Sequence, residues 1–369
     1  MFGFSLTVVS TLLLVYIIWR LSSIPRFSDV VPGKIFLYGG IFVWAILAGG
    51  RFFGHGEGPA WASLADFIGI TITGVLFLVF VCLFPVDLAT GFGRYFSGIA
   101  PYLRGWAMLG GCLLSVAATI QGVRAPTVIN HEVQLNNLPK EMDGTTIVAL
   151  SDLHLGAVLG PSWLESRVAQ VQMLQPDFIF LLGDIFEGHG ENTEAFAPIF
   201  RKLSAPYGVW SVDGNHENHG KTGGSKSNLD GTQIPTLQNE LIEPISGLVL
   251  AGRSVPRNHD KATTTPSWNP PRTRPSGGLI LLSHFPEDSQ GAAQTGVDLM
   301  LSGHTHGGQV WPFSLLVGMV QPMLGGRYEV EGMTLLVCRG TGTWGPRMRL
   351  WRPSEILHIR LLSGNSPTG

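Results

Sequence analysis

Charged side chains are scarce in this chain. Only 14% of its 369 residues are Asp, Glu, Lys or Arg, against about 25% in an average soluble protein, and the mean hydropathy is +0.25. This composition excludes a disordered chain and a protein that is soluble throughout. The net charge of −2 excludes a basic protein that coats nucleic acid, and we expect no nucleic-acid partner.

Cysteine is also rare, with three residues in the whole chain. That number excludes a small secreted fold held together by disulfides. Cys82 and Cys112 fall in apolar runs, and Cys338 ends a predicted strand. We therefore interpret all three as packing residues.

The deficit of charge is concentrated in the first third of the sequence. Residues 1–124 contain seven of the 24 Lys and Arg residues and four of the 26 Asp and Glu residues. Four uncharged runs occur there, and a membrane-spanning helix needs about 20 apolar residues. We predict an all-α transmembrane domain over 1–124 with four spans, at about residues 3–20, 34–51, 67–86 and 105–123. A buried core helix is the alternative for each run, and most of all for the short second one.

Basic residues are unevenly distributed between the predicted loops. Five lie in the first and third loops, at Arg20, Arg26, Lys34, Arg94 and Arg104. The opposite side has Arg51 and Arg124, with Lys140 farther along the chain. The positive-inside rule then places the first and third loops in the cytoplasm. Because four spans put both termini on the same side, we expect the termini, and the domain after the fourth span, to lie outside the cytoplasm.

From residue 125 the chain consists of short apolar runs that end in polar residues. Such runs are typical of buried strands, and they cover residues 146–150, 178–182, 208–212, 248–252, 279–282, 299–302, 334–338 and 356–362. Alternation over 127–135 predicts a first strand. Apolar spacing between Pro161 and Pro176 predicts a helix over 161–175. We expect an α/β domain over 125–363, with a Pro-rich insertion at 253–277 and a tail at 364–369.

Five short motifs follow these predicted strands, at the sheet edge where strand ends converge. They are Asp152-Leu-His154, Gly183-Asp184, Gly214-Asn215-His216-Glu217, His284 and Gly303-His304-Thr305-His306. Imidazole mixed with carboxylate suits manganese, iron or zinc better than magnesium or calcium. The set exceeds what one ion needs, whereas two ions that share one carboxylate would use all of it.

In this order the motifs resemble those of the calcineurin-like metallophosphoesterases. The tracts SDLHLG (151–156), GHTHGGQV (303–310) and CRGTGTWGPRMRL (338–350) are similar to those of a membrane-associated bacterial subgroup. The resemblance covers about residues 126–363. It implies a metallophosphoesterase sandwich of two sheets with flanking helices, here placed after the four-helix transmembrane domain.

The resemblance also implies two divalent metal ions, Mn²⁺, Fe²⁺ or Zn²⁺, and a role for each motif residue. Asp152, His154 and His306 would hold the first ion. Asn215, His284 and His304 would hold the second, and Asp184 would bridge the two. His216 would be a catalytic group beside the leaving oxygen, and Glu217 would support it or a ligand. Arg339, directly after a predicted strand, is a candidate for substrate binding, with a structural salt bridge as the alternative.

The function implied is membrane-anchored, dimetal-dependent hydrolysis of a phosphoester, of phosphodiesterase or pyrophosphatase type. Because tethering confines the site near the bilayer, we expect a lipid-linked or headgroup phosphoester as substrate. The expected location is a bacterial inner or plasma membrane with the catalytic domain extracytoplasmic. The alternatives are a nuclease or soluble-nucleotide phosphatase, and a non-enzymatic metal-binding scaffold. A transporter is disfavoured because we expect no ionisable residue inside the spans.

Overall fold

A computed structural model describes residues 2–53, 60–156, 158–187, 193–218, 229, 231–255 and 276–364. The chain divides into two compact units. The helical unit comprises Met1–Arg124 with Gly345–Leu350, and the second unit comprises Ala125–Trp344 with Trp351–Gly369. The sequence pattern predicts one domain over 125–363. In the structure, Gly345–Leu350 instead belongs to the helical unit.

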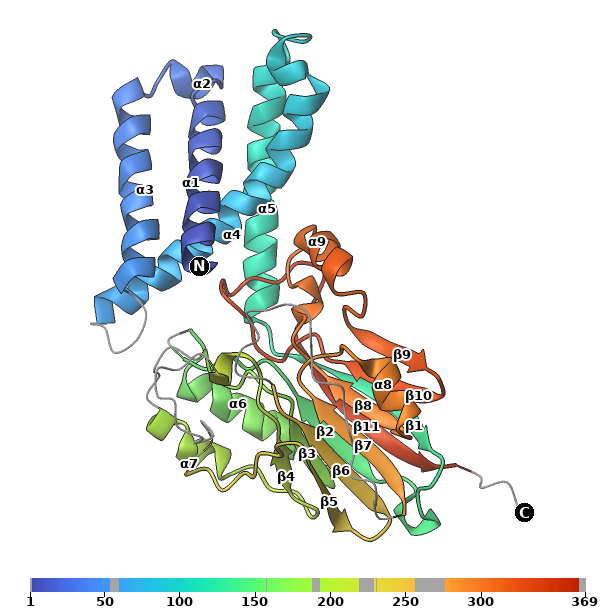
Figure 1. The fold of residues 1–369 in the computed structure, drawn as a ribbon. Helices are drawn as coiled ribbons and strands as arrows, with labels where there is room; N and C mark the ends of the chain where they lie inside the picture. The colour runs from blue at the N-terminus through green and yellow to red at the C-terminus, as the bar shows by residue number, and fades with distance from the viewer. Residues whose placement is uncertain are drawn as a thin grey trace. The chain divides into compact units, whose positions relative to one another are not determined.

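Among its described residues the helical unit has four long helices, which are labelled in Figure 1. They are α1 (Phe2–Leu21), α3 (Gly33–Phe53), α4 (Ala60–Ala89) and α5 (Ala100–Val123), and the short helix α2 (Pro25–Ser28) follows α1. By length and composition each long helix can cross a membrane. A helix satisfies its own backbone hydrogen bonds, as a segment surrounded by lipid must. All four predicted spans fall inside these helices.

The helical unit buries an ionic cluster around Asp87 of α4. The Asp87 carboxylate lies 2.6 Å from Nε of Arg20 in α1 and 2.8 Å from Nε of Arg104 in α5. Tyr16 donates a further hydrogen bond to the same carboxylate. Asp87 is fully buried, and the two arginines are 3% and 5% exposed. The cluster therefore joins three helices through one charge.

The expectation that no span contains an ionisable residue is wrong. Helix α4 continues past residue 86, so Asp87 lies inside the apolar segment Leu64–Ala89 rather than beyond its end. Arg20 and Arg104 likewise fall within the apolar segments of their helices. A charged residue marks the end of a span when the sequence is read alone. The partners that neutralise Asp87 inside the helical unit come from distant parts of the chain, so the sequence does not reveal them.

The second unit is built on two sheets. The first has the strand order β1-β11-β2-β3-β4, and only the β11–β2 pair is antiparallel. Its strands are β1 (Thr127–Leu135), β2 (Thr146–Leu150), β3 (Phe178–Leu181), β4 (Val209–Ser211) and β11 (Glu355–Ser363). All five were predicted from the sequence.

The second sheet has the order β5-β6-β7-β8-β10-β9, in which antiparallel edge strands flank four parallel ones. Its strands are β5 (Glu240–Ile245), β6 (Leu248–Arg253), β7 (Gly278–Ser283), β8 (Leu299–Ser302), β9 (Gly326–Val330) and β10 (Met333–Val337). The sequence did not predict the edge strands β5 and β9. The predicted insertion at 253–277 falls mostly outside the described residues.

Alternate side chains of these strands build separate cores. Ile147 and Ala149 of β2 face a core shared with the second sheet, for example with Leu282 and Leu301. The intervening Val148 packs in an outer core with α6 (Pro161–Gln172) and α7 (Ala197–Phe200). Helix α8 (Ser289–Gln294) contributes to the outer core of the other sheet. Because both faces of the central strands are covered, strands such as β2, β3, β7 and β8 are almost wholly apolar. The predicted α/β sandwich with flanking helices is confirmed.

The buried cluster gives a stability prediction for the helical unit. Asp87→Ala leaves Arg20 and Arg104 without their counter-charge, and removing one partner of a buried ion pair costs about 3–5 kcal/mol. We expect a clear loss of unfolding free energy, measured by denaturation in detergent micelles. Asp29→Ala, at an exposed position, is the control. Equal stability of the two variants would contradict the assigned role of Asp87.

Candidate metal centre

The motif residues converge at the carboxyl ends of strands from both sheets. The first sheet supplies Asp152 and His154 after β2, Asp184 after β3, and Asn215 and His216 after β4. The second sheet supplies His284 after β7, and His304 and His306 after β8. Adjacent parallel strands end at the same edge, which is why residues far apart in the sequence meet here.

The chain turns sharply at five of these residues. Left-handed φ angles occur at Asp152 (54°), His154 (46°), Asp184 (51°), His304 (71°) and His306 (50°). Such angles are uncommon for residues other than glycine and cost about 1–3 kcal/mol each. Other non-glycine residues of the chain also adopt such angles, for example Gln175 and Glu331, but five of the converging residues do so together, as is typical of functional sites.

Asp152, His154 and His306 form the first group. Nε2 of His154 lies 3.0 Å from Nε2 of His306, and Nε2 of His306 lies 3.4 Å from Oδ1 of Asp152. All three side chains are buried. One ligand atom from each lies within 4.8 Å of the others.

Asp184, Asn215, His284 and His304 form the second group. Oδ1 of Asn215 lies 3.1 Å from Nε2 of His284 and 3.0 Å from Nδ1 of His304. Oδ2 of Asp184 lies 3.2 Å from Nε2 of His284 and 3.8 Å from Nε2 of His154. Asp184 thus lies between the two groups.

The donor atoms of both groups fit divalent cations. Nδ1 of His284 donates to the carbonyl oxygen of Leu182 at 2.8 Å, so its Nε2 is the ring atom that points at the oxygens of Asp184 and Asn215. In the first group two imidazole nitrogens face each other across 3.0 Å. Lone pairs directed at one another need a proton or a cation between them. Imidazole oriented by a backbone carbonyl is a common arrangement at metal sites.

Buried charges shift the pKa values of these residues. Burial alone would lower the pKa of His284, but Asp184 and Asp152 outweigh it and raise the pKa to about 10. Burial also opposes the charge on His154, whose pKa rises to about 9 because of Glu187, Asp184 and Asp152. These imidazoles balance the buried carboxylates by holding protons. A divalent cation supplies the same positive charge in their place.

Glu217 connects the loops that hold Asp184 and Asn215. Its carboxylate accepts hydrogen bonds from the backbone N–H groups of Asp184 (2.9 Å), Ile185 (2.7 Å), Phe186 (3.3 Å) and Gly214 (2.7 Å). Burial and the nearby Asp184 raise the pKa of Glu217 to about 7. The loops also approach closely, since a Cβ atom on Gly214 would lie 2.1 Å from Oδ1 of Asp184.

His216 lies at the edge of the first group. Its Nδ1 donates to the carbonyl oxygen of Glu187 at 2.8 Å and lies 3.6 Å from Oε2 of the same residue. Its ring centroid is 4.7 Å from that of His154. The backbone N–H of His216 donates to Oδ1 of Asp184 at 2.9 Å.

Glu187 is a site residue that the sequence did not predict. Its Oε2 lies 3.4 Å from Nδ1 of His154, so one carboxylate lies beside two histidines of the cluster. The feature of the sequence that could have identified Glu187 is its position three residues after Asp184, in the same loop. A lone glutamate at that spacing is not distinctive, because it makes its contacts with residues from two other loops.

Arg339 forms an ion pair within the second unit. Its Nη1 lies 2.9 Å from Oε2 of the buried Glu355, and its backbone N–H donates to Oε1 of Glu355 at 2.8 Å. A Cβ atom on Gly307 would lie 3.1 Å from the stem of Arg339, which places this side chain against the turn after His306. These contacts correspond to the structural salt bridge, which is the alternative to substrate binding for Arg339. They support the loop that carries His306.

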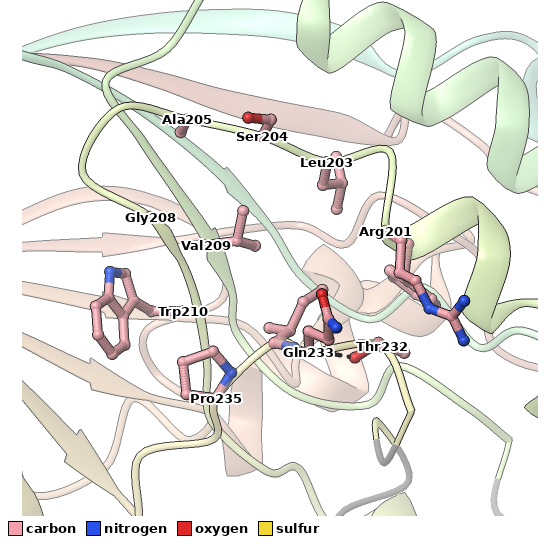
Figure 2. Close-up of a pocket in the computed structure, with 12 residues that line it drawn as sticks. Arg201, Leu203, Ser204, Ala205, Gly208, Val209, Trp210, Thr232, Gln233 and Pro235 are labelled. Atoms are coloured by element: carbon pink, nitrogen blue, oxygen red, sulfur yellow. Dashed lines mark hydrogen bonds between the residues drawn. The ribbon is translucent and has the colours of Figure 1, made fainter.

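A separate cavity lies along β4 and the loops that precede and follow it. It has a volume of about 350 Å³ and is lined by residues between Phe200 and Trp210 and by Thr232–Pro235. Figure 2 shows Arg201, Trp210 and Gln233 around it. None of the converging Asp, Asn and His side chains lines this cavity, so it is distinct from the metal centre.

Comparisons with known proteins agree with this arrangement. A family model described as calcineurin-like phosphoesterase matches residues 145–308. A metallophosphoesterase of Helicobacter pylori is 31% identical over 66% of this chain, and the match spans 66% of its own length. A zebrafish (Danio rerio) transmembrane protein with metallophosphoesterase domain is 28% identical over 82% of this chain and 74% of its own. A metallophosphoesterase of Bacillus subtilis is 29% identical over 64% and 85%.

The contacts of Glu217 predict an effect on metal affinity. Glu217→Gln removes one acceptor oxygen and places N–H groups against N–H groups, so the loops that hold Asp184 and Asn215 lose their fixed geometry. We expect Mn²⁺ affinity to fall about 10–100-fold, measured by calorimetric titration of the metal-stripped protein. Glu165→Gln, in an exposed ion pair with Lys202, is the control. An unchanged affinity in Glu217→Gln would show that these hydrogen bonds do not hold the site.

Proposed function

Because the chain belongs to the calcineurin-like phosphoesterase family, as its motifs predict, we propose that it is a membrane-anchored, metal-dependent phosphoester hydrolase. The proposed type is a phosphodiesterase or pyrophosphatase. The observation that carries the proposal is the convergence of seven candidate ligands at the carboxyl ends of strands from both sheets, in two groups with Asp184 between them.

In this proposal the two groups hold two divalent ions. Asp152, His154 and His306 would hold one ion, Asn215, His284 and His304 would hold the other, and Asp184 would be shared between them. Mixed nitrogen and oxygen ligands favour Mn²⁺, Fe²⁺ or Zn²⁺. When bound, such a pair of ions polarises the phosphoryl oxygens and lowers the pKa of water that attacks phosphorus.

His216 is the proposed proton donor to the leaving oxygen. The hydrogen bond from its Nδ1 to the carbonyl of Glu187 fixes the orientation of the ring. The Glu187 carboxylate lies 3.6 Å from the same Nδ1 atom. A proton on Nε2 can then pass to the oxygen that departs from phosphorus. General acid catalysis of this kind contributes about 10²–10⁴-fold in rate.

The proposed substrate is a lipid-linked or headgroup phosphoester. Strand β1 begins at Thr127, four residues after α5 ends at Val123, so the chain itself ties the catalytic unit to a helix that can cross a membrane. Tethering raises the effective concentration of any substrate in the same bilayer. A nuclease or soluble-nucleotide phosphatase would gain nothing from this tether, and a metal-binding scaffold would not need His216.

The proposed location is a bacterial inner or plasma membrane, with the catalytic unit outside the cytoplasm. Arg20 and Arg104 lie near the ends of α1 and α5. Together with Arg26, Lys34 and Arg94 they give one end of the helices five basic residues, which supports this orientation. A reporter enzyme fused after Gly369 that is active only outside the cytoplasm tests it. We expect this reporter to be active. If it is inactive, and a reporter that works only in the cytoplasm is active at the same position, the catalytic unit lies in the cytoplasm and the proposed orientation is wrong.

The catalytic proposal predicts distinct effects for two substitutions. With the full-length protein in detergent, metal-stripped and supplied with Mn²⁺, we expect hydrolysis of bis-p-nitrophenyl phosphate. His216→Ala should lower kcat about 10²–10⁴-fold while leaving the bound Mn²⁺ unchanged. Asp184→Asn should lose both activity and metal, because the bridging charge is gone.

His358→Ala is the matched control, since His358 pairs with Asn130 in the sheet, away from the metal centre. It should behave like the unchanged protein. An unchanged rate of hydrolysis in His216→Ala would contradict the proposed catalytic role of His216. Metal binding without hydrolysis of any phosphoester would favour the scaffold.

A further inference from the structure

Helix α9 (Phe313–Val320) presents an apolar surface to the outside of the second unit. Ser314 is its one buried residue. The exposed large apolar residues on and just before the helix are Trp311, Phe313, Leu315, Leu316, Met319 and Val320, of which Met319 is 81% exposed and Val320 78%. We refer to these six residues as the α9 surface.

The sequence around α9 contains no charge. Residues 307–326 include no Asp, Glu, Lys or Arg, in a unit whose other loops are rich in them. Single exposed apolar residues are ordinary on a protein surface, but a contiguous patch marks a contact with lipid or with another protein. An uncharged helix tip, with methionine, valine and leucine outermost, matches lipid better than a polar partner.

The base of α9 is fixed to two tryptophans. Gln309 donates from Nε2 to the carbonyl oxygen of Trp344 at 2.8 Å and accepts from the Trp344 backbone N–H at 2.9 Å. The ring of Trp311 packs on that of Trp351, with centroids 4.9 Å apart. Trp344 and Trp351 are the residues directly before and after Gly345–Leu350.

The segment Gly345–Leu350 is packed among the apolar helices. The backbone N–H of Arg349 donates to the carbonyl oxygen of Ala118 in α5 at 2.8 Å. A Cβ atom on Gly122 would lie 2.6 Å from the carbonyl oxygen of Arg347, so glycine is required there for the close approach. Met348 and Arg349 are fully buried. The tryptophans that hold α9 are therefore covalently attached to a piece of the membrane-spanning unit.

The other end of α9 is fixed to the metal centre. Thr305, between the candidate ligands His304 and His306, donates from Oγ1 to the carbonyl oxygen of Leu324 at 2.7 Å. The segment 306–324 thus leaves the metal centre and returns to it, with α9 at its far side. Whatever surface α9 contacts, the metal centre is held at the base of the same loop.

We propose that the α9 surface inserts into the lipid bilayer at the level of the headgroups and holds the metal centre against the membrane. The substrate class that this fits is an amphiphilic phosphoester whose apolar part stays in the bilayer while its phosphate reaches the site. The insertion stands on the α9 surface and the connections of its base. The substrate class rests, in addition, on the proposed phosphoesterase function.

Nitroxide accessibility tests the insertion directly. The full-length protein carries Cys82→Ala and Cys112→Ala, keeps the buried Cys338, and receives a spin label through Met319→Cys. The matched control is Met173→Cys, a methionine of the same unit that is 75% exposed at the end of α6. Both are reconstituted in vesicles of phosphatidylcholine with one quarter phosphatidylglycerol and probed with oxygen and with a water-soluble nickel complex.

We expect the ratio of oxygen to nickel collisions to be several-fold higher at position 319 than at position 173, because oxygen concentrates in lipid and the nickel complex does not. Equal, water-like ratios would overturn the proposal. A label at 319 that neither reagent reaches would also overturn it, since the α9 surface would then be covered by protein, either this chain or a second copy.

The charge variant Leu316→Asp/Met319→Asp tests the substrate class. We expect its rate on a phosphodiester lipid in the same vesicles to fall at least about tenfold, and its rate on soluble bis-p-nitrophenyl phosphate to stay unchanged. Equal loss on both esters, or on neither, would contradict the role of α9 in presenting substrate. If the unaltered protein hydrolyses neither ester, the proposed phosphoesterase function fails, while the accessibility experiment still decides the insertion.

Discussion

The buried carboxylate of Asp184 is the charge on which the metal centre depends. It lies between two groups of imidazoles, and burial makes its charge costly unless positive charge surrounds it. His284, His216 and His154 supply that charge and hold the pKa of Asp184 well below its usual range. Cations at this point would satisfy the same requirement, and the surrounding structure is arranged to keep the ligands in place when protons leave them.

That arrangement explains features of the loops that packing alone would not favour. Five converging residues adopt left-handed backbone angles, and a folded chain keeps such strain only where other contacts compensate for it. Glu217 is one such contact, because its carboxylate binds four backbone N–H groups in the loops after β3 and β4. The ion pair between Arg339 and Glu355 lies against the turn after His306. Contacts from the surrounding structure thus hold the strained loop residues that follow the strands.

The convergence of these candidate residues could be predicted from the sequence because each of them follows a buried parallel strand. The runs at 146–150, 178–182 and 299–302 are apolar enough to be recognised, and the polar residue that ends each one must lie at the common edge. Glu187 and Glu355 could not be predicted in the same way, because their partners come from other loops. Strand β5 includes Pro244 and two glutamates, and β9 is short and polar, so neither has a recognisable strand pattern.

The helical unit shows the same limit. The apolar runs predict four helices, but the ends of α4 and α5 extend beyond the uncharged residues because Asp87, Arg20 and Arg104 neutralise one another inside the unit. The residues Gly345–Leu350 carry two arginines and give no membrane signal by themselves. They pack with the helices through backbone contacts at Ala118 and Gly122, which depend on the close approach of two distant segments rather than on any local pattern.

The central claim is that the strand ends of the two sheets bind two metal ions through seven side chains, with Asp184 between the ions. Electron paramagnetic resonance of the protein loaded with Mn²⁺ tests it most directly. Two ions about 3.5–4 Å apart should bind as two equivalents per chain and give the multiline spectrum of an exchange-coupled pair. Binding of a single equivalent, with the six-line spectrum of isolated Mn²⁺, would contradict the account.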